Sequence, residues 1–198
     1  MRDRPRRIVV GISGASGAIY GIRLLEVLRA IDGLETHLVL SSAAGKTIAL
    51  ETDWQPRQVE ALADRSYKHN DIAAALSSGS FATDAMIIVP ASMKTAAAVA
   101  WGFDDNLITR AADVHLKERR PLIVCPRETP LHLGHLRTLG QLAEIGAIVA
   151  PLMPAFYGRP NTVQEIVDHQ VGRLLDLLGV EGGEGLAFRW TGAVKADD

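Results

Sequence analysis

The feature that most constrains the fold of this chain is a repeated alternation of short apolar segments with amphipathic ones. The apolar segments are rich in Val, Ile and Leu, which predicts strands at 7–13, 37–41, 86–89, 122–125 and 147–150. The stretches between them carry apolar residues at helical spacing. Apolar strands that are joined through helices form parallel sheets buried on both faces. The pattern therefore predicts an α/β protein with a mostly parallel sheet between two layers of helices.

Six stretches are predicted to be helical: 18–31, 44–52, 92–101, 106–118, 132–145 and 162–178. The segment from 53 to 80 is the least regular part of the chain. Pro90 follows an apolar strand and is expected to end it, because proline cannot donate a hydrogen bond within a sheet. No repeat, low-complexity block or linker interrupts the chain. We therefore expect one domain over residues 1–198, with a core at about 7–180 and a polar, glycine-rich tail at 181–198.

Composition excludes several classes of function. The 198 residues carry a formal net charge of −2, so we expect no nucleic-acid partner and no anionic membrane partner. No apolar run reaches the ~20 residues of a membrane span. The apolar stretch after the basic start is too short for a signal peptide, so we expect a cytoplasmic protein. His132 and His135 lie three residues apart, but no cysteine or carboxylate follows at a confirming distance, so we expect no metal site.

The first predicted strand runs into a loop of small residues, and a helix follows at once: Gly11-Ile12-Ser13-Gly14-Ala15-Ser16-Gly17-Ala18. A strand, a small-residue turn and a helix N-terminus can hold a phosphate, because backbone N–H groups can reach the ligand. The glycines fall three residues apart, which matches neither the dinucleotide fingerprint nor the P-loop. The spacing suggests a mononucleotide or another phosphate ester. On the loop alone, a tight turn without a ligand stays equally open.

Ligands of parallel α/β sheets bind at the carboxyl ends of the strands. Four strand ends carry hydroxyl groups, small residues or an arginine, and we expect them to converge: 13–17, 41–42, 90–95 and 126–128. Hydroxyl groups, helix N-termini and a guanidinium group are what a phosphorylated ligand requires. The agreement among the four ends favours a phosphate site over an empty turn.

Read together, these segments resemble the UbiX-type flavin prenyltransferase family. The matching pieces run in family order over nearly the whole chain: Gly14-Ala15-Ser16-Gly17-Ala18, Glu51-Thr52-Asp53, Pro90-Ala91-Ser92-Met93-Lys94-Thr95, residues 105–113, residues 116–121, Pro126-Arg127-Glu128-Thr129-Pro130-Leu131 and Pro154-Ala155-Phe156-Tyr157. Ala91 stands where the family often has cysteine. Any one piece would be weak evidence, whereas their ordered combination is highly specific.

The resemblance implies a three-layer Rossmann-like flavoprotein fold with a mostly parallel six-stranded sheet, assembled as a homododecamer. It implies that reduced FMN is bound as a substrate rather than as a redox catalyst. The implied activity joins a dimethylallyl group from dimethylallyl monophosphate to N5 and C6 of reduced FMN, without a metal. The prenylated FMN would serve a UbiD-type decarboxylase, in ubiquinone biosynthesis or in aromatic-acid decarboxylation.

The resemblance also assigns residues to the flavin. The phosphate loop of the family corresponds to Gly14, Ala15 and Ser16, and the further flavin contacts correspond to Ser41, Ser92, Met93, Lys94, Thr95 and Arg127. Residue chemistry leaves other roles open for several of them. Ser92 and Thr95 could cap a helix, Met93 could belong to the core, and Lys94 could lie in solvent.

Three residues match family positions credited with acid, base or cation roles: Glu51, Lys117 and Glu128. A fixed cation at Lys117 would stabilise the departing phosphate, and the two glutamates would transfer protons. Tyr157 and Arg173 match the family's contacts to dimethylallyl phosphate. The residue pattern alone favours other roles, namely a helix C-terminal cation for Lys117, an ion pair for Glu128 and a surface position for Arg173.

Two alternative functions share much of this pattern. A flavoprotein that decarboxylates cysteine needs a catalytic histidine in a loop near the flavin, and residues 105–107 offer none. An accessory flavin-binding subunit of an aromatic-acid decarboxylase would keep the flavin site and lack the transfer chemistry.

Overall fold

The computed structural model describes residues 4–183 and 185–189. Within them, six strands form one sheet in the order β3-β2-β1-β4-β5-β6. The sequence predicts a mostly parallel sheet, and every neighbouring pair is in fact parallel. The strands are β1 (Arg6–Ile12), β2 (Leu34–Leu40), β3 (Arg65–Tyr67), β4 (Ala85–Ala91), β5 (Leu122–Pro126) and β6 (Ile148–Val149).

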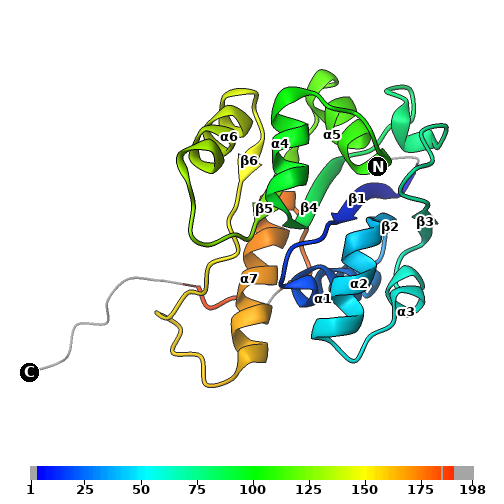
Figure 1. The fold of residues 1–198 in the computed structure, drawn as a ribbon. Helices are drawn as coiled ribbons and strands as arrows, with labels where there is room; N and C mark the ends of the chain where they lie inside the picture. The colour runs from blue at the N-terminus through cyan, green and yellow to red at the C-terminus, as the bar shows by residue number, and fades with distance from the viewer. Residues whose placement is uncertain (1–3, 184, 190–198) are drawn as a thin grey trace, which may run out of the picture.

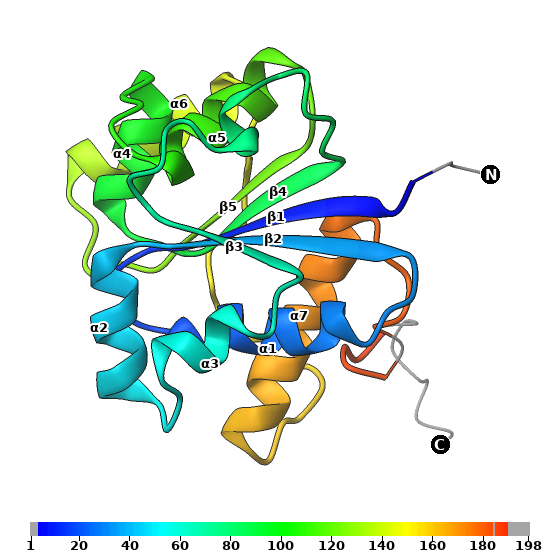
Figure 2. The same ribbon diagram turned by 90° about the vertical axis from the view of Figure 1, so that its right-hand side faces the viewer.

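Helices cover both faces of the sheet and make three layers (Figure 1). Figure 2 shows α1, α2, α3 and α7 on one face and α4, α5 and α6 on the other. Each of the six predicted helices begins and ends within two residues of its observed bounds. The observed helices are α1 (Ala18–Arg29), α2 (Ser42–Glu51), α4 (Met93–Trp101), α5 (Leu107–Lys117), α6 (Leu133–Glu144) and α7 (Val163–Leu178).

Strand β3 lies in the segment that the sequence leaves irregular. It is three residues long, it forms one edge of the sheet, and Arg65 and Ser66 are exposed. A strand of this kind carries no apolar run, and its parallel pairing with β2 is set by the fold. The same segment holds helix α3 (Pro56–Glu60) and a 3₁₀ turn at Ala75–Ser77.

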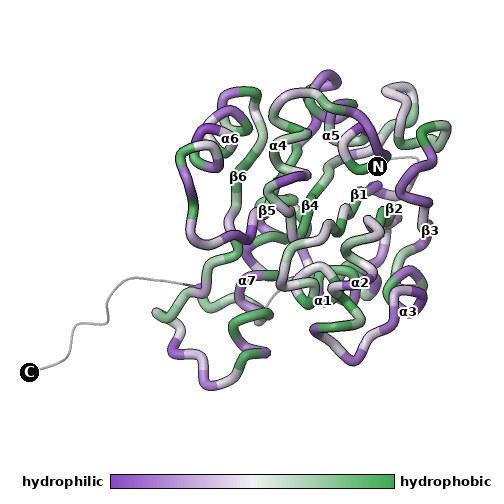
Figure 3. The backbone as a smooth tube through the Cα atoms, viewed as in Figure 1, coloured by the Kyte–Doolittle hydropathy of each residue, from purple (hydrophilic) through white to green (hydrophobic). Residues whose placement is uncertain are grey.

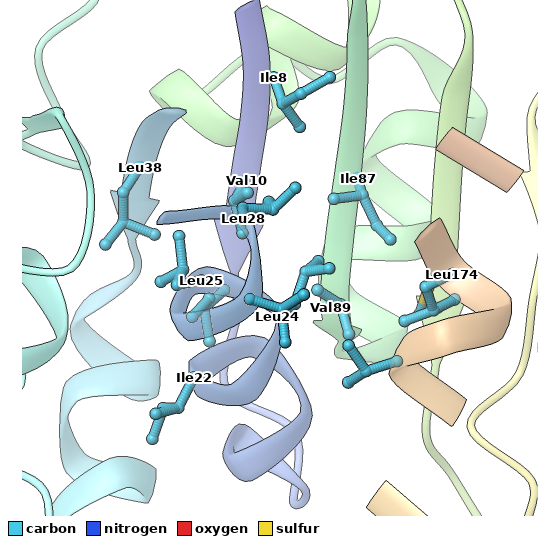
Figure 4. Packing of buried hydrophobic residues seen from close by; sticks show 14 of the residues in the cluster. Ile8, Val10, Ile22, Leu24, Leu25, Leu28, Leu38, Ile87, Val89 and Leu174 are labelled. Atoms are coloured by element: carbon cyan, nitrogen blue, oxygen red, sulfur yellow. The ribbon is translucent and has the colours of Figure 1, made fainter. Parts of the chain in front are cut away.

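Alternate side chains of the strands point into two apolar cores. In β1, Ile8 and Val10 belong to the core under α1 and α7, whereas Val9 belongs to the core under α4 and α5. Figure 3 shows the hydrophobic strands at the centre of the molecule. Figure 4 shows Leu24 and Leu28 of α1 beside the strands. Because burying a side chain of this size contributes ~1.5–3 kcal/mol, the two cores hold the strand ends firmly in place.

Strand β4 continues past Pro90, which corrects the expectation that the proline ends it. The pairing with β5 shifts register between Ile88 and Ala91, and Ala91 pairs with Pro126. Proline cannot donate at this position, but its carbonyl oxygen accepts the backbone N–H of Ser13 at 3.1 Å. The irregularity falls at the carboxyl edge of the sheet, where the loops of the candidate site begin.

The described part of the C-terminal tail packs against α7. A Cβ on Gly172 would lie 2.7 Å from the Ala187 Cβ, so the helix and the tail approach closely. Arg6 of β1 donates to the carbonyl oxygens of Leu178 and Gly179 and anchors the end of the helix. The rest of the predicted tail, residues 190–198, lies outside the described residues. None of the helices described is long and apolar enough to cross a membrane.

Candidate active site

Ser13 braces the carboxyl ends of β1 and β4. Its hydroxyl donates to the Pro90 carbonyl oxygen at 3.1 Å and accepts the backbone N–H of Ser92 at 2.7 Å. The side chain is buried, so these hydrogen bonds form away from competing water. They hold the turn after β1 against the start of α4. The sequence places Ser13 in the loop but does not reveal this positioning role.

At Gly14 the loop makes a close approach to α2. A Cβ built on Gly14 would lie 2.3 Å from the Ala43 Cβ, far inside van der Waals contact. A residue without a side chain is needed for the loop and the helix to come this close. Packing against α2 is therefore a reason for this glycine that is independent of any ligand.

A pocket of about 450 Å³ opens beside this loop. Three of its lining residues are helix N-caps: Ser41 of α2, Ser92 of α4 and Asn106 of α5 accept first-turn backbone N–H groups at 3.0, 3.3 and 3.0 Å. Three helix N-termini thus place partial positive charge around one cavity. Five residues that the sequence assigns to the flavin line this pocket, namely Gly14, Ser41, Ser92, Lys94 and Thr95.

Three other predicted flavin residues lie next to the pocket rather than in its wall. Ala15 is buried, and its backbone N–H donates to the Ser13 carbonyl oxygen at 2.9 Å. Ser16 follows in the same turn. Met93 packs in the apolar core with Ala96, which is the role that residue chemistry leaves open for it.

Glu51, at the end of α2, reaches the start of α1. Its carboxylate accepts the backbone N–H of Gly17, the N-cap residue of α1, at 2.8 Å. A carboxylate is stabilised there because the N-terminus of a helix carries partial positive charge. The helix start that the sequence assigns to a phosphate therefore holds a glutamate side chain. The N-termini of α2, α4 and α5 surround the pocket instead.

The fourth strand end lines a second pocket, of about 350 Å³. Arg127 and Glu128 follow β5 in this pocket, and both side chains are exposed. The backbone N–H of Arg127 donates to the Ala91 carbonyl oxygen at 3.3 Å, which ties this strand end to the start of α4. Three of the four strand ends therefore share one pocket, and the fourth lies in a neighbouring one.

Lys117 lies at the end of the sheet opposite to the carboxyl ends of the strands. It is the last residue of α5, which returns the chain from the carboxyl edge of β4 to the beginning of β5. The next residue, Glu118, lies against Gly79, shortly before β4. The Lys117 Nζ atom is 3.4 Å from a Glu118 carboxylate oxygen, and the side chain is half exposed. Because the strands are five to seven residues long, Lys117 cannot reach either pocket within one copy of the chain.

Tyr157 and Arg173 belong to a third cluster, beside α7. The Tyr157 hydroxyl lies 2.9 Å from His169 Nε2, and Arg173 follows His169 by one helical turn. Arg173 and Arg189 both form ion pairs with Asp176, and the hydrogen bond from Arg189 is the main cause of the lowered pKa of that carboxyl group. The two residues predicted to bind the donor therefore lie near one stretch of α7, Tyr157 against His169 and Arg173 one turn further along. Arg173 is also exposed, which is the surface position that the residue pattern alone favours.

The irregular segment supplies a residue of the larger pocket that the sequence does not indicate. His69 lines this pocket with Asp105 and Asn106. Its carbonyl oxygen accepts the backbone N–H of Leu107 at 2.8 Å and fixes the segment against α5. Burial lowers the pKa of the His69 imidazole. Since no helical or strand periodicity marks residues 53–80, only the fold brings His69 to the pocket.

The larger pocket suits a flavin mononucleotide. Three helix N-termini and the Lys94 ammonium group attract a phosphate, and the hydroxyl groups of Ser92 and Thr95 suit a ribityl chain. When bound, FMN would supply the reacting ring, and the chain would supply orientation and charge. In the ranges 4–183 and 185–189, no three His, Cys, Asp or Glu side chains are grouped so that they could hold a metal ion.

Comparison with known proteins identifies close relatives. The Flavoprotein family model matches residues 1–175. Flavin prenyltransferase UbiX of Escherichia coli K12 is 55% identical over 188 residues, which cover 95% of this chain and 100% of the relative. Flavin prenyltransferase LpdB of Lactiplantibacillus plantarum is 54% identical over 171 residues, which cover 86% of this chain and 91% of the relative.

Solved structures agree with these relationships. AnUbiX (PadA1), in complex with FMN and dimethylallyl pyrophosphate, has a TM-score of 0.93 at 49% identity and covers 96% of this chain and 100% of its own. A dodecameric FMN-dependent UbiX-like decarboxylase of Escherichia coli O157:H7 has a TM-score of 0.91 at 49% identity, with coverage of 94% and 100%. The predicted flavoprotein fold and FMN binding are confirmed. The chain belongs to the Flavoprotein family and, within it, to the UbiX-type flavin prenyltransferases.

Proposed function

We propose that this flavin prenyltransferase joins the dimethylallyl group of dimethylallyl monophosphate to N5 and C6 of reduced FMN and releases inorganic phosphate. The observation that carries the proposal is the pocket at which three helix N-caps meet Gly14, in a chain 55% identical to a flavin prenyltransferase. The AnUbiX complex contains dimethylallyl pyrophosphate, which supports a dimethylallyl phosphate ester as the class of donor.

Reduced FMN would occupy the larger pocket. Its phosphate suits the N-termini of α2, α4 and α5, where backbone dipoles and Lys94 attract an anion. The hydroxyl groups of Ser41, Ser92 and Thr95 would orient the ribityl chain. Arg127 would contact the flavin from the neighbouring pocket, because its backbone is tied to the start of α4.

Proton transfer would fall to the two glutamates. Glu51 accepts a hydrogen bond from the Gly17 N–H, as a carboxylate does, and would take up the proton lost from C6. Glu128 follows Arg127 in the second pocket and would donate a proton to the departing phosphate. In this scheme each carboxyl group has one role: Glu128 lines the second pocket, and Glu51 lies at the start of α1.

The cations that hold the donor would come together only in an assembly. Lys117 lies at the far edge of the sheet, so a second copy of the chain must supply it to any site at the carboxyl edge. Tyr157 and Arg173 would bind the phosphate of the donor, with Lys117 as an added positive charge. We propose a homododecamer, in line with the dodecameric UbiX-like decarboxylase. Exposed Trp101, Phe103 and Leu133 are suited to contacts between copies.

We further propose that the product serves a UbiD-type decarboxylase in the cytoplasm. The accessory-subunit alternative makes a different prediction for this partner. An accessory subunit would still activate the decarboxylase after Glu128→Ala, whereas an enzyme would lose activation while the two proteins still bind. The measurement is decarboxylase activity together with a pull-down of the partner.

Anaerobic incubation with reduced FMN and dimethylallyl monophosphate tests the reaction directly. We expect a flavin that has gained one dimethylallyl group, detected by mass spectrometry, and one inorganic phosphate per flavin. A parallel incubation with dimethylallyl pyrophosphate identifies the donor. Unchanged FMN in the presence of assembled protein would refute the proposal, and carbon dioxide released from a cysteinyl substrate would indicate the decarboxylase alternative.

A further inference from the structure

His169 is a buried residue of α7 that the proposed chemistry does not use. Its side chain is 9% exposed. The Nε2 atom lies 2.9 Å from the Tyr157 hydroxyl, and the two rings meet edge to face with centroids 5.2 Å apart. The Phe188 ring also packs against Tyr157, with centroids 5.8 Å apart. The tyrosine ring thus contacts both a histidine of α7 and a phenylalanine of the tail.

The hydrogen bonds of His169 determine which ring nitrogen carries the proton. The backbone N–H of Phe188 donates to Nδ1 at 3.2 Å. A backbone N–H can only donate, so Nδ1 offers its lone pair and the proton of the neutral imidazole resides on Nε2. Nε2 therefore donates to the Tyr157 oxygen. As a result, the O–H bond of the tyrosine points away from the imidazole.

The surroundings of His169 favour the neutral imidazole. Burial lowers its pKa, and the positive charges of Arg173 and Arg189 lower it further. Glu165 and Asp168 line the pocket of about 250 Å³ beside it. A neutral ring is needed for this arrangement, because a protonated Nδ1 could no longer accept the Phe188 N–H.

We propose that His169 is a positioning residue for the prenyl donor: it holds the Tyr157 phenol by its oxygen and turns the hydroxyl proton toward the donor phosphate. A phenol that accepts one hydrogen bond is also a stronger donor of its own. Arg173, one turn further along α7, then stands next to the same anion. The inference rests on the proposed function, in which Tyr157 and Arg173 bind the phosphate of dimethylallyl monophosphate.

Three single variants and one double variant test this role. His169→Ala removes the donor to Tyr157, whereas His169→Gln can still accept from Phe188 and donate to Tyr157. Affinity for dimethylallyl monophosphate is measured by calorimetry on protein loaded with oxidised FMN, which binds without turnover. We expect about tenfold weaker binding for His169→Ala and Tyr157→Phe, and binding within about twofold of wild type for His169→Gln. In the Tyr157→Phe background, the additional change His169→Ala should weaken donor binding by less than about twofold.

Two controls separate positioning from folding. The affinity for FMN and the melting temperature of His169→Gln should match those of wild type. Between pH 7 and pH 5, the pH dependence of donor affinity should differ between wild type and His169→Gln. The phosphate of the donor titrates in both proteins, but a histidine at this position titrates only in wild type.

Wild-type donor affinity in His169→Ala, full additivity of the two substitutions, or loss of affinity in a well-folded His169→Gln would overturn the inference. Unchanged affinity in Tyr157→Phe would overturn both the role of Tyr157 and the inference built on it. If wild type binds the donor and the variants behave as expected but no prenylated flavin forms, the proposed function fails and the positioning role stands.

Discussion

Replacing Gly14 by alanine tests whether the close approach of the loop to α2 shapes the FMN site. The new Cβ would meet the Ala43 Cβ at 2.3 Å, and ordinary van der Waals contact begins at 3.4 Å. The loop and the helix must therefore separate by about 1 Å. Both elements line the larger pocket, so the separation displaces backbone groups that we assign to the flavin.

The size of the effect follows from the cost of overpacking. Forcing one extra methyl group into a packed contact costs ~1–3 kcal/mol. If this cost falls on the FMN-binding conformation, affinity for FMN drops about 5-fold to 150-fold. The assay is titration of flavin-free protein with FMN, followed by quenching of flavin fluorescence. The melting temperature is recorded in parallel.

A second substitution makes the test specific. Ala43→Gly removes the atom that the new Cβ would meet, so the double variant Gly14→Ala/Ala43→Gly should bind FMN more tightly than Gly14→Ala alone. Ala43→Gly by itself costs roughly 1 kcal/mol of helix propensity. Gly140→Ala is the matched control, because a Cβ there has open space around it in α6. If the double variant binds no better than Gly14→Ala, the steric reasoning is wrong.

Three further predictions concern other parts of the molecule. Burial lowers the pKa of His115 to about 4, so the free energy of unfolding should fall by roughly 3 kcal/mol from pH 6.5 to pH 4, because the unfolded chain takes up the proton first. In urea unfolding, the free energy of unfolding of His115→Gln should depend less steeply on pH than that of wild type. An equally steep dependence would contradict the prediction. Glu51→Gln keeps an acceptor for the Gly17 N–H, so the affinity for FMN should stay within about twofold of wild type. Prenylation should slow about a hundredfold, because the amide cannot take up a proton. An unchanged rate would show that Glu51 takes no part in the chemistry. Co-expression of Lys117→Ala with Glu51→Gln should give mixed oligomers more active than either variant alone, and no gain would argue against a lysine supplied by another copy.

Local patterns predicted the elements of the fold well. Apolar periodicity identified five of the six strands and six helices, because each such element needs its own buried side chains. Strand β3 was missed because an edge strand of three residues, two of them exposed, buries almost nothing of its own. The end of β4 was misplaced because Pro90 is accommodated by a register shift that depends on its neighbours.

The sequence by itself determined the helix starts at Ser92 and Asn106, since capping is a contact between residues two or three apart, whereas it placed Ser41 in a strand. It also determined the family, because the order of the matching segments is a property of the chain alone. Only the tertiary structure decided which functional residues meet. It places the three caps around one pocket, puts Lys117 at the end of the sheet opposite to that pocket, and brings Tyr157 against His169 of α7. These placements depend on how segments far apart in the chain pack around the sheet, and local sequence patterns do not predict that packing.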